Sequence, residues 1–162
     1  MTVLIVEDGS IVAGSNTYVA AATLTAYATA RGKTLVTDPT ILIVQAMDYL
    51  EQLYYLGIKK TRDQSLQWPR INVLIDGYYL DSDVIPQQLK DGLCEISIAI
   101  DEGTDPLLDV SPGVKRERVE GAVEVEYKDG GNSQTINVRI NNVLKKLLAG
   151  GGSGYNFNVS KG

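Results

Sequence analysis

The spacing of apolar residues predicts four helices, and the clearest of them lies in the middle of the chain. Five apolar side chains recur there at steps of four, four, three and four residues: Ile85, Leu89, Leu93, Ile96 and Ile100. These steps place the side chains on one face of a helix. We expect this helix to begin near Pro86, because proline suits a first turn, and to end at Gly103.

A second helix is expected from Pro39 to Gly57. Asp38 is a good N-cap, the proline fits the first helical position, and two adjacent apolar stripes form a broad face that would be buried. A fourth helix is expected over about 137–149, where leucines line one edge and two lysines lie near the C-terminal end.

The remaining helix is expected over residues 17–30, a stretch that is rich in alanine and contains no glycine or proline. Ser15 or Asn16 is the candidate N-cap, and Gly32 is the candidate stop. The small side chains would allow a neighbouring helix to approach closely.

Period-two alternation appears between residues 114 and 127. Valines and a tyrosine alternate with glutamates there, which predicts a β-hairpin that turns near Glu120-Gly121. Residues 57–84 show no helical period and form a long connection, with a strong turn signal at Asp76-Gly77.

The two ends of the sequence look like arms. A short apolar run at residues 3–6 precedes a turn, and the glycine-rich run 150–154 tethers a short alternating segment, 155–162. This segment is expected either to dock on another chain by strand addition or to be a disordered terminus. We therefore expect a mainly α fold with a β-hairpin (α+β), a small helical bundle with extended N- and C-terminal arms. The bundle would comprise residues 1–149 and the C-terminal arm residues 150–162.

Composition then narrows the classes of function. The net charge of −5 argues against a surface built throughout to hold nucleic acid. The absence of histidine removes the commonest general base and zinc ligand. Cys94 is a single cysteine, expected to be a buried structural thiol in a reducing compartment. The N-terminus lacks the basic region of a secretion signal, and no apolar run is long enough to span a bilayer.

No pattern of residues indicates catalysis, a metal site or a cofactor. The glycine run at 150–154 follows a helix rather than a strand, and it lacks the lysine of a phosphate loop, so a hinge is favoured. Asp81 and Asp83, like the acids at 101–105, lack the spacing of a calcium loop, and solvated loops are the better interpretation. We expect a protein that is not an enzyme.

One loop combines cations with aromatic rings. Lys59, Lys60 and Arg62 precede Trp68 and Arg70, and tyrosines lie on either side of this stretch. Single-strand binders use such a combination to contact phosphates and stack bases. The alternative is that Trp68 and Tyr54 fill the core while the cations face water. We favour that alternative because the chain as a whole is acidic.

Short motifs stand in a characteristic order along the chain: Ile5-Val6-Glu7-Asp8-Gly9, Gly14-Ser15-Asn16-Thr17-Tyr18-Val19, Ala30-Arg31-Gly32, Ala46-Met47-Asp48-Tyr49-Leu50, Leu66-Gln67-Trp68-Pro69-Arg70, Ile85-Pro86, Leu89-Lys90-Asp91, Gly113-Val114-Lys115-Arg116-Glu117-Arg118-Val119 and Leu147-Leu148. In this order and spacing the sequence resembles the head–tail connector (adaptor, or head-completion) proteins of long-tailed bacteriophages. Many relatives of this kind are described as DnaT-like single-stranded DNA-binding proteins.

The resemblance implies a structural protein of the virion neck, made in the cytoplasm of the bacterial host. Its subunits would form a ring, generally dodecameric, that extends the DNA channel below the portal. The implied partners are other copies of the chain, the portal protein, and a tail-terminator or stopper protein. DNA would pass through the channel without sequence-specific binding, and no membrane is involved. The alternative function is single-stranded DNA binding.

Candidate residues follow for each type of contact. Apolar residues of the fourth helix and the C-terminal arm are expected to bind the portal: Leu144, Leu147, Leu148, Tyr155, Phe157 and Val159. Opposite charges on the hairpin at 114–127 are expected to join neighbouring subunits: Lys115, Arg116, Arg118, Glu124 and Glu126. In the alternative function, four residues of the basic loop would contact nucleic acid: Lys59, Lys60, Arg62 and Trp68.

Overall fold

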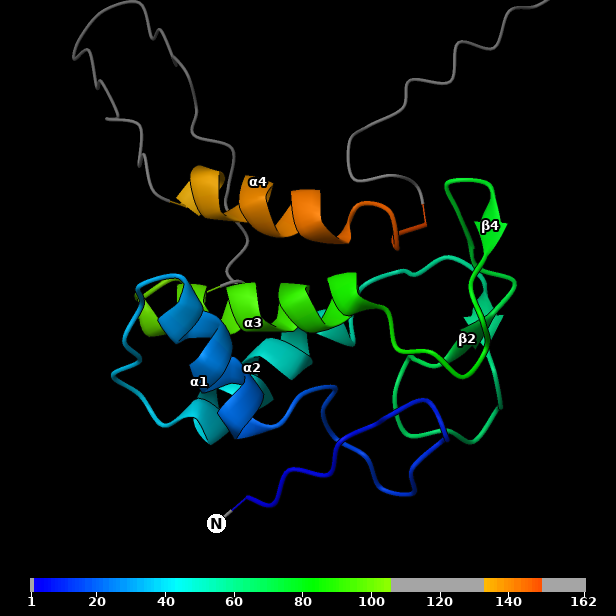
Figure 1. Ribbon diagram of the computed structural model, residues 1–162, viewed down its shortest axis with the longest axis horizontal. Helices are drawn as coiled ribbons and strands as arrows, with labels where there is room; N and C mark the ends of the chain where they lie inside the picture. The colour runs from blue at the N-terminus through cyan, green and yellow to red at the C-terminus, as the bar shows by residue number, and fades with distance from the viewer. Residues whose placement is uncertain (1, 106–132, 150–162) are drawn as a thin grey trace, which may run out of the picture.

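The computed structural model describes residues 2–105 and 133–149 (Figure 1). The hairpin expected at 114–127 and the arm at 150–162 lie outside the described residues. The expected portal-binding residues Tyr155, Phe157 and Val159 therefore lie outside them too. So do the expected inter-subunit residues: Lys115, Arg116, Arg118, Glu124 and Glu126.

Four helices form the body of the described part: α1 (Ala21–Ala30), α2 (Pro39–Leu50), α3 (Gln87–Asp101) and α4 (Ser133–Leu144). Helix α3 lies in the middle, with α1 and α2 on one side and α4 on the other (Figure 1). Leu89, Leu93 and Ile96 of α3 are fully buried, as the apolar stripe predicts. Its helical limits also agree with the prediction within the usual uncertainty of helix ends.

Helix α1 begins four residues later than predicted, because residues 17–20 are not helical. Thr17 forms a parallel bridge with Val6, and the Glu7 backbone N–H donates to the Thr17 carbonyl at 2.8 Å. The expected caps are used elsewhere: the Ser15 hydroxyl donates to the Glu7 carboxylate, and the Asn16 side chain accepts from the Ile5 N–H. Tertiary contacts of the N-terminal segment thus override the local helix signal.

Helix α2 begins as predicted, with the Asp38 carboxylate accepting from the Thr40 N–H at 2.7 Å. It ends at Leu50 rather than Gly57. The following segment, residues 54–56, bonds to the end of α4 instead: the Leu56 N–H donates to the Leu147 carbonyl at 2.8 Å, and Tyr55 bridges Leu148.

The long connection contains two short antiparallel hairpins. Strand β1 (Ile58–Lys59) pairs with β2 (Arg70–Ile71), and β3 (Leu74–Ile75) pairs with β4 (Tyr78–Tyr79). Asp76 and Gly77 form the predicted turn between β3 and β4, both with positive φ. Four helices with two small hairpins confirm a mainly helical α+β fold.

The expected helix at 137–149 is found earlier, as α4. The chain then turns, and Leu144 and Leu147 are both fully buried against the other helices. At Gly92 of α3 an added Cβ would lie 2.5 Å from Leu144 Cδ2, so the absence of a side chain there permits the close approach of the two helices.

Candidate interaction surface

The ring of Trp68 cannot stack on a base, because it is completely buried. It packs edge-on against Tyr55, with the ring centroids 5.8 Å apart and an interplanar angle of 77°. The structure thus corrects the candidate DNA contact at Trp68 and confirms that this side chain fills the core. Tyr54, which was expected in the core as well, is instead exposed. Its indole N–H is a buried donor without a partner among the described residues.

Arg70 has a structural role under the same loop. Its guanidinium donates to the carbonyls of Leu56 at 2.7 Å and Gly57 at 2.8 Å, and to the Gln67 side chain at 3.1 Å. Burial lowers the pKa of Arg70, while the nearby acidic groups oppose that effect. With its donors used in this way, Arg70 holds the segment before β1 in place.

A half-buried carboxylate ties the same loop to the helices. Glu51 accepts hydrogen bonds from the Tyr18 hydroxyl at 2.6 Å and from the Gln67 N–H at 2.8 Å. The Trp68 N–H in turn donates to the Tyr18 oxygen at 3.2 Å. Burial raises the pKa of Glu51 above its ordinary value despite these bonds. The sequence carried no signal for this network, because its members are up to 50 residues apart.

The other three expected DNA-contact residues are accessible to different degrees. Arg62 lies 3.7 Å from Asp63, and both side chains are almost fully exposed. Such a pair contributes little to stability. Lys59 and Lys60 are half-buried and have no ion pair among the described residues.

Exposed aromatic rings gather elsewhere, at the end of the molecule where both hairpins meet the C-terminal turn of α4. Tyr54, Tyr78 and Tyr79 are 83%, 80% and 75% exposed. Ile58 and Leu74 are also exposed there. With Lys59, Lys60, Lys145, Lys146 and Asp76, these five apolar residues form what we call the tyrosine end.

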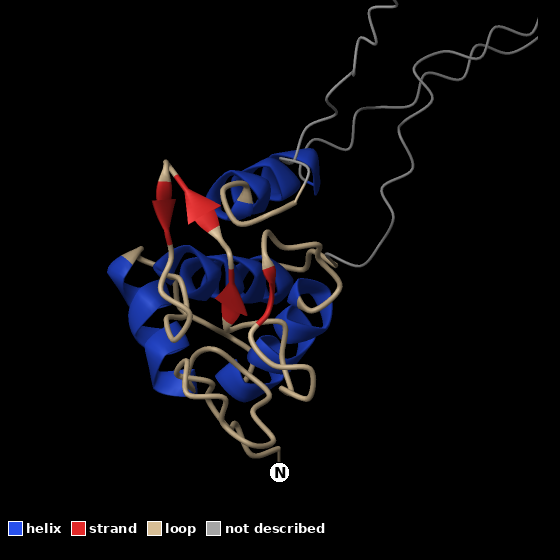
Figure 2. Cartoon of the chain, turned by 90° about the vertical axis from the view of Figure 1, so that its right-hand side faces the viewer, coloured by secondary structure: helices blue, strands red, loops and turns tan. Residues whose placement is uncertain are grey.

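Contacts between distant segments assemble the tyrosine end. The Ala149 N–H donates to the Tyr54 carbonyl at 2.8 Å. Lys146 donates to Asp76 at 2.6 Å, which joins the turn of the β3–β4 hairpin to the chain after α4. Figures 1 and 2 both show this hairpin beside the C-terminal end of α4.

Charge at the tyrosine end is opposite to that of the whole chain. Its four lysines and one aspartate leave a net charge of +3, whereas the chain carries −5. Lys59, Lys60 and Lys145 have no ion pair among the described residues, so their charge is available to a partner. Exposed rings beside free cations can bind either a protein surface or a nucleic acid.

Two of the expected portal-binding residues do not belong to any surface. Leu144 and Leu147 are fully buried in the core, and Leu148 is half-buried. Their spacing reflects packing of α4 against α3, which sequence periodicity cannot distinguish from packing against a partner. The exposed side chains beside the C-terminal end of α4 are instead Lys145 and Lys146, which follow the helix, and the tyrosines of the tyrosine end.

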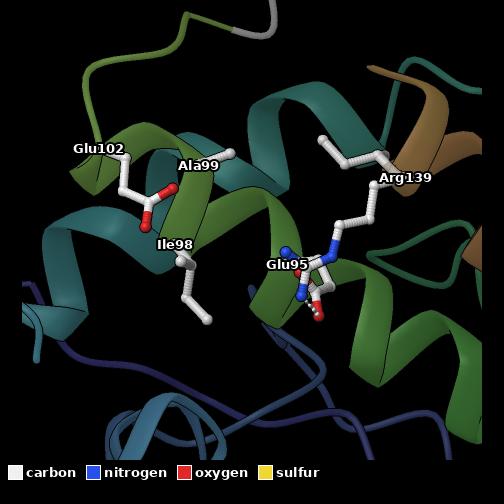
Figure 3. Close-up of a pocket in the computed structure, with 6 residues that line it drawn as sticks. Glu95, Ile98, Ala99, Glu102 and Arg139 are labelled. Atoms are coloured by element: carbon white, nitrogen blue, oxygen red, sulfur yellow. Dashed lines mark hydrogen bonds and ion pairs between the residues drawn. The ribbon is translucent and has the colours of Figure 1, made fainter. Parts of the chain in front are cut away.

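A small pocket lies between α3 and α4 (Figure 3). Glu95 on α3 receives Arg139 of α4 at 3.0 Å, the Tyr27 hydroxyl at 2.9 Å and Arg31 at 3.5 Å. The space of about 30 Å³ has room for little more than a water molecule. These contacts fix the positions of three helices, and the size of the pocket makes it unsuitable for a substrate.

Other groups considered from the sequence offer no reaction centre in the described part of the chain. Cys94 is buried, as expected, and burial raises the pKa of its thiol to about 12. Within residues 2–105 and 133–149, no three potential metal ligands come together. None of the described helices is both long and apolar enough to cross a bilayer.

The model of a protein family described as "Putative DnaT-like ssDNA binding protein" matches residues 2–162. The chain belongs to this family. The match confirms the DnaT-like part of the sequence resemblance. The printed description mentions DNA binding and no virion component, so the match does not support the connector part. No curated protein and no solved structure matches the chain.

Proposed function

We propose that this DnaT-like family member is a structural subunit of the bacteriophage neck, a head–tail connector rather than an enzyme. The observation that carries the proposal is the tyrosine end, where five large apolar side chains are exposed on a well-packed framework. Tyrosine is enriched at protein interfaces, and a surface of this kind is typical of a docking site.

The residues that carry the family resemblance support a structural role. The Glu7 carboxylate accepts hydrogen bonds from the N–H groups of Gly9, Ile11 and Val12, which shapes the N-terminal loop. Trp68 and Arg70 hold the long connection against the helices. The described motif residues therefore build and brace the fold.

In the proposed function, copies of the chain form a ring between the portal and a tail-terminator or stopper protein. The resemblance to connector proteins implies twelve subunits in this ring. DNA would cross the ring without being held. A net charge of −5 on each copy is suited to this task, because an acidic wall repels phosphate. The virion neck would be the location, after synthesis in the host cytoplasm.

Single-stranded DNA binding is the second candidate function, and the family description supports it more directly. At the tyrosine end, exposed rings stand beside lysines that have no ion pair among the described residues. Bases could stack on Tyr78 or Tyr79 while Lys59 and Lys60 contact phosphates. Trp68, now known to be buried, would not take part.

Two measurements on the full chain separate the functions. The connector must be found in purified mature virions by quantitative mass spectrometry, at several copies per portal ring. Absence from these particles would overturn the connector proposal. A DNA binder must bind labelled oligo-dT with an affinity that falls steeply as salt concentration rises.

If the chain binds oligo-dT, charge-reversal variants identify the surface that binds it. Lys59→Glu combined with Lys60→Glu should abolish it, whereas Lys90→Glu, which makes the same kind of charge change beside Asp8, should have a much smaller effect. Oligo-dT binding that is unaffected by the first pair of substitutions would exclude the tyrosine end as the DNA site.

A further inference from the structure

A second exposed apolar surface lies at the other end of α3. Val36, in the loop between α1 and α2, is 91% exposed, and Ile41 on the first turn of α2 is exposed as well. This loop is nevertheless fixed in place, because Asp101 at the end of α3 accepts from the N–H groups of Val36 and Thr37, at 2.9 and 2.8 Å.

We call this second surface the valine end. It comprises Val36 and Ile41 with four charged residues: Lys33, Asp38, Asp101 and Glu102. Lys33 pairs with Glu102, which leaves the two aspartates without a cation among the described residues. The net charge of the valine end is −2, opposite in sign to the +3 of the tyrosine end.

The two surfaces lie at opposite ends of the helical layer, as Figure 1 shows. Helix α3 separates them, and its 15 residues span roughly 22 Å at 1.5 Å per residue. One copy of the chain therefore cannot bring its own tyrosine end and valine end together. A second copy can, if it is placed in line with the first.

We infer that the tyrosine end of one copy docks on the valine end of the next, in a head-to-tail contact. This inference rests on the proposed function, which requires identical subunits in a ring, and it names the two surfaces that join them. Contacts between two different patches are the kind that close into rings. Opposite charges would orient the approach, and both patches would bury apolar side chains.

The acidic valine end also distinguishes this partner from a nucleic acid. Asp38 and Asp101 would repel phosphate, whereas they would attract Lys59, Lys60 and Lys145 of a neighbouring copy, which have no ion pair in the part of the chain that the structure describes. The tyrosine end of another copy of the chain is a partner with the required positive charge and exposed apolar side chains.

Cysteine cross-linking of the full chain tests the contact. The native Cys94 is buried with a raised pKa, so introduced thiols are the ones expected to react with a short bis-maleimide. The variants are Val36→Cys and Tyr79→Cys, made separately and together. A head-to-tail contact predicts a ladder of multimers from the double variant and dimers from a mixture of the two single variants.

Each single variant alone should stay monomeric in this assay. Self-cross-linking of Tyr79→Cys at the level of the mixture would show a two-fold contact and overturn the inference. The matched control combines Tyr79→Cys with Val138→Cys, because Val138 is exposed on α4 and belongs to neither end. An equally long ladder from this control would indicate random collision and would also overturn it.

The outcomes separate this inference from the proposed function. Virions that contain the chain, with no ladder from the double variant, would reject the named surfaces and leave the connector function standing. A ladder that shortens as salt concentration rises, with the chain absent from virions, would support the contact and reject the connector function.

Discussion

Burial divides the aromatic residues of this chain into two groups with different roles. Tyr55 is buried, and its hydroxyl donates to the Leu50 carbonyl, while Tyr54 beside it is almost fully exposed. The sequence shows two identical neighbours. The contact that distinguishes them comes from Leu147 and Leu148, more than 90 residues away, and so no local pattern could assign their roles.

Trp68 shows the same limit in another way. A tryptophan among lysines and arginines fits a stacking site as well as a core position, and charge balance alone favoured the core. The structure decides the question through Glu51 and Tyr18, which accept hydrogen bonds from the backbone N–H groups of Gln67 and Trp68.

The raised pKa of Glu51 leads to a prediction about pH. Because the pKa of Glu51 is higher in the folded chain than in the unfolded chain, the folded chain holds the proton of this carboxyl more tightly. Protonation therefore stabilises the fold, and this stabilisation is complete below the ordinary pKa of 4.5 that applies in the unfolded chain. It is lost as pH rises through the folded pKa. The free energy of unfolding of the native chain minus that of Glu51→Gln should therefore decrease as pH rises from 4.5.

Urea denaturation of both proteins between pH 4 and 8 measures this difference, and the subtraction cancels the titration of all other acids. The amide of the variant keeps one acceptor for Tyr18, so the variant is expected to fold. A difference that stays constant, or grows with pH, would contradict the raised pKa of Glu51.

At the scale of elements, strong periodicity and capping residues were sufficient to locate a helix where local preferences and tertiary contacts agree. The stripe of α3 and the Asp38-Pro39 start of α2 were predicted at the right places. The start of α1 and the end of α2 were wrong, because in both places the backbone bonds to a distant segment: Thr17 to Val6, and Leu56 to Leu147. Helix propensity is too weak to oppose such pairing.

Gly92 supplies the prediction for this scale. Alanine favours a helix over glycine by about 1 kcal/mol, so Gly92→Ala would stabilise an isolated helix. In the folded chain, its Cβ would press on Leu144, which is fully buried and cannot move aside freely. We expect a decrease in the free energy of unfolding of about 1–3 kcal/mol, measured by chemical denaturation.

The partner substitution provides the control. Leu144→Ala alone should cost about 2–5 kcal/mol, because it opens a cavity. In that background the added methyl of Gly92→Ala has space and should become neutral or stabilising. Additive losses in the double variant would show that α3 and α4 do not make this close contact.

At the scale of the whole molecule, charge is separated along the helical layer. Three segments that are remote in sequence, around residues 54–60, 74–79 and 145–149, supply the cations and rings of the tyrosine end. The sequence displayed these lysines as two separate short runs in an acidic chain. The two runs lie close together because α4 packs against α3, and the apolar periodicity of the sequence does not specify how these helices pack.

The end of the described chain at Ala149 gives the last prediction. The Ala149 N–H makes the last backbone hydrogen bond of the described chain, to Tyr54, and the buried Leu147 comes just before it. A chain that stops after Ala149 should keep the thermal midpoint of the full chain. A matched chain that stops after Leu144 should lose about 2–5 kcal/mol, since it lacks a fully buried leucine.

The same pair of truncations tests the arm. A chain ending at Ala149 retains the tyrosine end and the valine end, so it should still form the head-to-tail ladder. It lacks Tyr155, Phe157 and Val159, which the proposed connector function assigns to the portal contact, and so it should no longer be retained by immobilised portal protein. Normal retention would place the portal contact within residues 1–149, and a lowered thermal midpoint would show that residues 150–162 stabilise the folded unit.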